Sequence, residues 1–192
     1  MDLRQTVWLV AFLNLSYFGV EFTGARAIGS VSLFADSVDF LEDAAINLLI
    51  GMTLMASATV RARVGRCLAI LILIPGLATI WTAWSQFQAP SPPQPILLSV
   101  TGAGALAVNL ACALLLTRFR ASRGSLTRAA FLSARNDALA NVAIVAAGLV
   151  TAFLWRSAWP DLIVGLAIAA LNADAARDVW RAAGREADVN QA

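Results

Sequence analysis

The chain has 192 residues, of which 59% are hydrophobic and 14% charged, and its mean hydropathy is +0.73. This composition is too apolar for a soluble domain of that size and predicts an integral membrane protein. The formal net charge of +2 comes from arginines spread along the chain, so it does not indicate nucleic-acid binding. Histidine is absent, which leaves carboxylates to perform any ion chemistry.

Six stretches have roughly the length of a membrane-crossing helix. They are residues 7–28, 32–56, 67–88, 96–117, 129–155 and 161–180. Pro75-Gly76 is expected to kink the third span, and the proline-rich residues 89–95 connect it to the fourth. We therefore predict an all-α fold, a six-helix transmembrane bundle over residues 1–182, followed by a short cytoplasmic tail at 183–192 and no soluble domain.

The arginines predict the orientation of this bundle. Eleven of the fourteen precede span one, lie at or beyond the last turn of span six, or lie between spans two and three or spans four and five. Only Arg26 and Arg156 fall on the opposite side, and Arg135 lies inside span five. By the positive-inside rule both termini are expected in the cytoplasm, and the expected location is a bacterial inner membrane.

Span one carries polar residues inside its apolar run, among them Asn14 and Glu21. Polar and ionisable side chains inside a membrane helix are costly and usually face a cavity or another helix. For Asn14, interhelical hydrogen bonding and a place in an ion path both stay open.

Span two is the most acidic segment. Asp39, Asp43 and Asn47 follow one another at four-residue spacing, so they share one face of a helix. Asp36 and Glu42 flank that face. Carboxylates this close cannot all stay ionised without a counter-charge, which a divalent cation, bound protons or Arg135 could supply.

Span five repeats this pattern. Ser133, Asp137 and Asn141 form a second column at four-residue spacing, and the sequence D-A-x-x-N occurs both at Asp43 and at Asp137. Two matching oxygen columns on two helices predict one shared site, and oxygen-rich sites suit divalent cations.

Small residues recur every four positions in two other spans. They are Ala103, Ala107 and Ala111 in span four, and Gly165, Ala169 and Ala173 in span six. Such stripes are typical of closely packed membrane helices, so we predict helix contacts along both.

Residues 29–44 resemble the second-helix signature of cation diffusion facilitators, and residues 136–142 resemble the fifth-helix signature of that family. The resemblance implies a transporter, not an enzyme, that exports divalent metal in exchange for protons and has no resident cofactor. Zinc is the expected metal, with cobalt, cadmium, manganese, iron or nickel as alternatives.

Carried over by position, the resemblance assigns Asp39, Asp43 and Asp137 as metal ligands. The fourth ligand position falls on Ser133, where the family usually has histidine, and Asn136, Asn14 or water are alternatives for completing the shell. Proton coupling or support of the ligands is assigned to other polar residues of these helices: Asp36, Glu42, Asn47, Asn141 and Arg135. The expected partners are metal ions, protons, the lipid bilayer and a second copy of the chain, with no nucleic acid. The family's usual cytoplasmic dimerisation domain is not expected here, so the homodimer would form through the membrane domain.

Two alternatives come from other classes of protein. Intramembrane CDP-alcohol phosphotransferases bind metal through a motif that ends in G-x-x-x-D-x-x-x-D, which Ala35, Asp39 and Asp43 partly imitate. The upstream half of that motif, D-x-x-D-G, is absent, and the repeat at Asp137 would be unexplained. A structural membrane subunit with an internal hydrogen-bond cluster is the other alternative.

Overall fold

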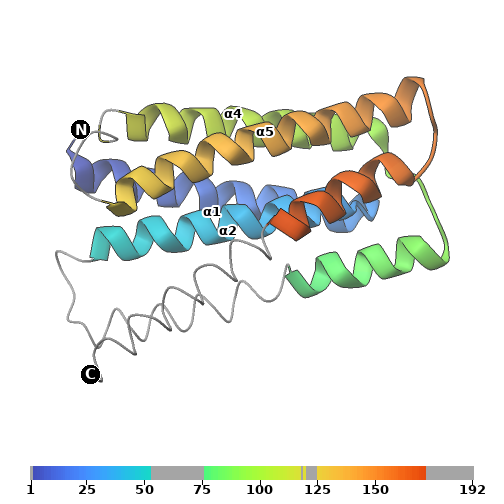
Figure 1. Ribbon diagram of the computed structural model, residues 1–192, viewed down its shortest axis with the longest axis horizontal. Helices are drawn as coiled ribbons and strands as arrows, with labels where there is room; N and C mark the ends of the chain where they lie inside the picture. Colours follow the sequence, from blue (N-terminus) through green and yellow to red (C-terminus); the bar gives the residue numbers. More distant parts are fainter. Residues whose placement is uncertain (1, 53–75, 118, 120–124, 172–192) are drawn as a thin grey trace.

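The computed structural model describes residues 2–52, 76–117, 119 and 125–171, and gives only the backbone for residues 125–135. Every regular element in these ranges is a helix (Figure 1). The helices are α1 (Leu3–Ile28), α2 (Val31–Met52), residues 76–88, α4 (Pro95–Thr117), α5 (Ser125–Phe153) and Trp159–Leu171. The prediction of an all-α fold with six helices is confirmed. Pro75, the predicted tail and the remaining parts of spans two, three and six lie outside the described ranges.

Local signals set the ends of α1 and the turn into α2. Asp2 and Gln5 form a capping box, in which each side chain accepts a hydrogen bond from the backbone N–H of the other residue. Gly29 ends α1 with φ 65°, a left-handed conformation that glycine adopts without steric cost. Ser30 Oγ then accepts a hydrogen bond from Leu33 N at 3.2 Å and caps α2. This short turn makes α1 and α2 an antiparallel hairpin.

The two hairpins α1–α2 and α4–α5 pack together into one bundle (Figure 1). α4 approaches α5 closely because both carry glycine at the contact. A Cβ atom at Gly148 would lie 2.2 Å from Ser99 Oγ, and one at Gly102 would lie 2.9 Å from Ile144 Cγ2. The predicted packing face of α4 is wrong, since Ala103, Ala107 and Ala111 are exposed. The buried face instead carries Gly102, Ala105, Asn109 and Cys112.

The bundle exposes large apolar side chains and buries several polar ones, as expected for a protein in a bilayer. In the described ranges, α1, α4 and residues Asn136–Phe153 of α5 are long and apolar enough to cross a membrane. Large apolar side chains point outward, for example Phe153 at 81% and Leu114 at 72% exposure. The fully buried side chains include Asn14, Glu21 and Asp36, each 0% exposed. The hydrophobic effect would favour the opposite arrangement in water.

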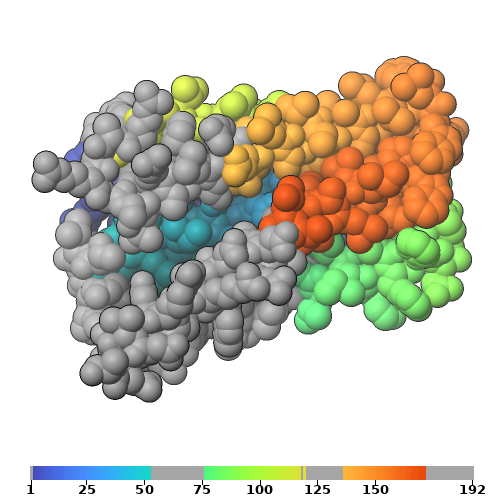
Figure 2. Space-filling view, viewed as in Figure 1, coloured from blue at the N-terminus to red at the C-terminus, as the bar shows by residue number. Residues whose placement is uncertain are grey.

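The Trp159–Leu171 helix lies against the start of α2, and Figure 2 shows it between α5 and the 76–88 helix. A Cβ atom at Gly165 would lie 2.6 Å from Ser32 N and 2.7 Å from the Val31 carbonyl carbon. The predicted close packing is therefore found at this glycine. At the same end of the bundle, the rings of Phe87 and Trp159 meet edge to face, with centroids 5.8 Å apart.

Asp161 ties this helix to α2 by hydrogen bonds. Its Oδ2 accepts a bond from Val31 N at 2.7 Å, and its Oδ1 accepts bonds from Ser30 Oγ at 2.7 Å and from both the N–H and the hydroxyl of Ser32. The side chain is 1% exposed. A buried carboxylate of one helix thus occupies the positive N-terminal end of another and satisfies its free N–H groups.

We expect Asp161→Ala to lower the free energy of unfolding by at least about 2 kcal/mol, because buried donors lose their acceptor. Chemical denaturation in a mild detergent would measure the loss. Asp2→Ala is the matched control, since it removes an exposed helix cap that bonds within its own helix. Equal losses in the two variants would show that the bonds of Asp161 contribute nothing beyond an ordinary cap.

Candidate metal centre

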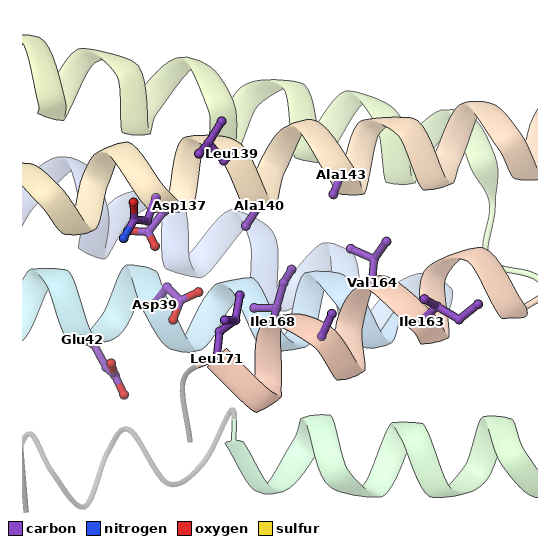
Figure 3. Close-up of a pocket in the computed structure, with 12 residues that line it drawn as sticks. Asp39, Glu42, Asp137, Leu139, Ala140, Ala143, Ile163, Val164, Ile168 and Leu171 are labelled. Atoms are coloured by element: carbon purple, nitrogen blue, oxygen red, sulfur yellow. The ribbon is translucent and has the colours of Figure 1, made fainter. Parts of the chain in front are cut away.

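Carboxylates from α2 and α5 meet at one end of a cavity of about 670 Å³ (Figure 3). The polar end is formed by Asp39, Glu42, Asn136 and Asp137. The rest of the wall is apolar and comes from α5 and the Trp159–Leu171 helix: Leu139, Ala140, Ala143, Ile163, Val164, Ala167, Ile168 and Leu171. The structure therefore brings Asp39 and Asp137 together, which are 98 positions apart in the sequence. An apolar wall strengthens every electrostatic interaction at the carboxylate end.

Asp39 lies at the centre of the acidic group. It is close enough to Asp137, Asp36, Glu42 and Asp43 for their negative charges to repel its own. Such repulsion is relieved when a cation or a proton is bound between the acids. In Figure 3, Asp39 and Asp137 approach each other, whereas Glu42 points away from Asp137.

Asp43 occupies a different environment from Asp39. It is 3% exposed, does not line the cavity, and lies close enough to Cys112 of α4 for its negative charge to act on that thiol. Among the described side chains, no three Asp, Glu or Cys residues stand close enough together to hold one metal ion. A site made of all three predicted aspartates would therefore need the Asp43 side chain to move toward the cavity.

The remaining predicted ligands divide by position. Asn136 is exposed and lines the cavity beside Asp137. Asn14 is fully buried away from it, where its Nδ2 donates to Val10 O at 3.1 Å and approaches Cys112 Sγ at 3.9 Å. Asn14 and Asp43 thus both lie near Cys112. The side chains of Ser133 and Arg135 are outside the described part of the chain, so their predicted roles stay predictions.

Two of the predicted supporting residues have defined partners. Asn47 Nδ2 donates to the Asp43 carbonyl at 2.9 Å, within α2. Asn141 Nδ2 donates to Asp36 Oδ2, and Asn141 Oδ1 accepts from Asn109 Nδ2 at 3.2 Å. A hydrogen-bonded chain therefore crosses from α4 through α5 to α2, next to the cavity.

Asp161 is the important polar residue that the sequence prediction missed. Its only local signal is its place at the start of an apolar helical run, which is a common position for aspartate. Its actual partners are more than a hundred residues away.

Comparison with known families identifies the chain. The family model of the cation efflux transmembrane domain matches residues 7–186, nearly the whole sequence. The chain belongs to this family. A comparison with curated proteins gave no match. The predicted membership of the cation diffusion facilitator family is confirmed, and members of this family are transporters of divalent metal cations.

We expect Ala143→Phe to slow metal transport severalfold with little change in equilibrium metal affinity. Ala143 lines the apolar part of the cavity, away from the carboxylates, so a phenyl ring there would obstruct the cavity without removing a ligand. Metal uptake by proteoliposomes and calorimetry would measure the two quantities. Val142→Phe is the matched control, because Val142 is 52% exposed and does not line the cavity. Normal transport by Ala143→Phe would mean that metal does not pass through this part of the cavity.

Proposed function

We propose that this transporter exports divalent metal, zinc in the first place, in exchange for protons, and that its transport site lies between α2 and α5. One observation carries the proposal. Asp39 and Asp137 lie on different helices and line the same cavity, and the chain belongs to the cation efflux family. Two opposed carboxylates at the end of an apolar cavity can exchange one dication for protons.

The donor set proposed for the ion consists of oxygen atoms. Asp39 and Asp137 are the first two ligands, Asp43 is the third after its side chain has moved, and Ser133, Asn136, Asn14 or water supplies the fourth. Zinc accepts four such ligands, with carboxylate oxygens at about 2.0–2.2 Å. Without imidazole the site shifts modestly toward harder ions, so manganese, iron and cobalt, and also cadmium and nickel, remain candidates.

Proton coupling follows from the same carboxylates. Acids that stand together repel one another when no cation is bound, and this repulsion favours proton uptake. Metal and protons therefore compete for one site, as an antiporter with alternating access requires. Glu42 and Arg135 are also proposed to take part in proton coupling. Glu42 lines the cavity, and its carboxyl group points away from Asp137.

The proposed setting is a bacterial inner membrane with both termini in the cytoplasm, as the arginine distribution indicates. The proposed working unit is a homodimer formed through apolar faces of the membrane helices. Its mass in mild detergent and in lipid would distinguish it from a monomer.

We expect Asp39→Asn and Asp137→Asn each to abolish transport and to weaken metal binding by more than the roughly 10–100-fold that loss of a supporting partner typically costs. The amide keeps the size of the side chain but removes the charge, so the fold should persist. Calorimetry on the purified variants measures the affinity.

Asp2→Asn is the matched control for these variants, since it removes an exposed carboxylate outside the cavity and asparagine caps helices equally well. Near-normal affinity in Asp137→Asn would contradict a site shared by α2 and α5. Lipid-phosphotransfer activity in the purified protein would instead favour the phosphotransferase. The absence of both metal transport and phosphotransfer would favour the structural subunit.

Metal binding should weaken as pH falls, because protons compete with the ion for the same carboxylates, and each ion bound should release at least about one proton. Calorimetry in buffers of different ionisation enthalpy counts the protons. If no proton is released between about pH 6 and 8, where perturbed carboxylates titrate, competition between metal and protons is excluded.

A further inference from the structure

Glu21 is a carboxylate buried in the middle of α1, apart from the cavity. It is 0% exposed, and neither of its carboxyl oxygens has a hydrogen-bond partner. Leaving an ionised carboxylate without a partner in an apolar interior costs many kcal/mol, so such a group either binds a cation or becomes neutral. The side chain therefore indicates a bound species at this position.

Asp36 of α2 faces Glu21. The two carboxyl groups lie within hydrogen-bonding reach of each other, and Asp36 is likewise 0% exposed. Its Oδ1 also has no partner. Ionised carboxylates only accept hydrogen bonds, so two of them cannot face each other stably unless a proton or a cation lies between them.

Among the described side chains, the polar groups around this pair supply one donor. Asn141 Nδ2 donates to Asp36 Oδ2, and its orientation is fixed because Asn141 Oδ1 accepts from Asn109. The hydroxyl of Tyr17 on α1, which lies close enough to feel the charges of the pair, donates instead to the Thr101 carbonyl at 2.6 Å. Asp36 therefore receives the amide donor and Glu21 receives none.

No basic side chain of the described residues compensates the pair. On α1, Arg4 and Arg26 are both exposed near the helix ends. Asp39 of α2 lies close enough to Glu21 for its negative charge to act on the pair, and Asp39 is itself repelled by Asp43 of α2 and Asp137 of α5. The negative charge of Asp39 favours a proton on the pair.

We propose that Glu21 carries a proton and donates it to Asp36 Oδ1, and that this pair is a second cation site, which holds an exchangeable proton of the transport cycle. On release the O–H bond of Glu21 breaks, the electron pair stays on its carboxylate and the proton passes to water. Asp36 lies three residues, about one helical turn, before Asp39 on α2. A dication bound at Asp39 stabilises the ionised pair by its positive charge, which links metal binding to proton release. This inference rests on the proposed metal–proton exchange.

The test compares the full-length protein with its Glu21→Gln variant. The amide is neutral and can donate to Asp36, so it imitates the protonated state. We expect metal affinity to stay within severalfold, and the count of protons released for each ion bound to fall by about one in calorimetry. Infrared difference spectroscopy should lose the C=O stretching band of one protonated carboxyl group.

Thr151→Val is the matched control, because Thr151 is a buried polar residue of α5 whose hydroxyl has no partner and which lies outside the pair. It should change neither the proton count nor the band. If Glu21→Gln does not fold, Asp36→Asn gives the same readouts, since an amide at this position donates to an ionised Glu21.

The proposal requires that Glu21→Gln both lowers the proton count and removes the infrared band. An unchanged proton count, a persistent band, or a sodium ion bound in place of the proton each overturns it. The failure of the proposed function is a separate result. Asp137→Asn should lose metal binding yet keep the infrared band of Glu21. Normal metal binding in Asp137→Asn refutes the transport site, and the infrared band then tests by itself whether Glu21 is protonated.

Discussion

The rest of the structure depends on one constraint: a carboxylate inside an apolar membrane interior must have a cation, a proton or hydrogen-bond donors beside it. The bundle buries Glu21, Asp36 and Asp43 and turns Asp39 to the cavity, while many of its large apolar side chains point outward. Isolated, each of these acids would oppose membrane insertion. Gathered on facing helices, they form an interior that favours the binding of positive charge.

The acids satisfy this constraint in two different ways. Asp161 accepts four hydrogen bonds from the start of α2, so its charge is fully used in holding two helices together. Glu21 accepts none. A carboxylate with all of its acceptor positions filled by fixed donors gains little from a cation, whereas one without donors gains much. The same side-chain chemistry therefore serves structure at Asp161, and in our proposal it serves ion binding at Glu21.

α2 connects the parts of the proposed transport cycle. Its Asp39 lines the cavity, and its Asp36 meets Glu21 and Asn141. Its first turn is held by Asp161 of the helix that also forms the apolar wall of the cavity. A movement of α2 relative to this helix would have to break or carry along the Asp161 hydrogen bonds. The proposed metal site, the carboxyl pair and the helix contact are thus mechanically linked through one helix.

The sequence by itself determined the all-α class and the two polar columns, because side chains four residues apart share a helix face. The repeated D-A-x-x-N motif also indicated that α2 and α5 contribute to one site, and Asp39 and Asp137 do line one cavity. Only the tertiary structure decided that Asp43 is buried outside the cavity lining, that Asp161 caps α2, and that Ala103 faces outward. The physical reason is that spacing fixes which residues share a face, but packing fixes the rotation of each helix, and hence what that face meets.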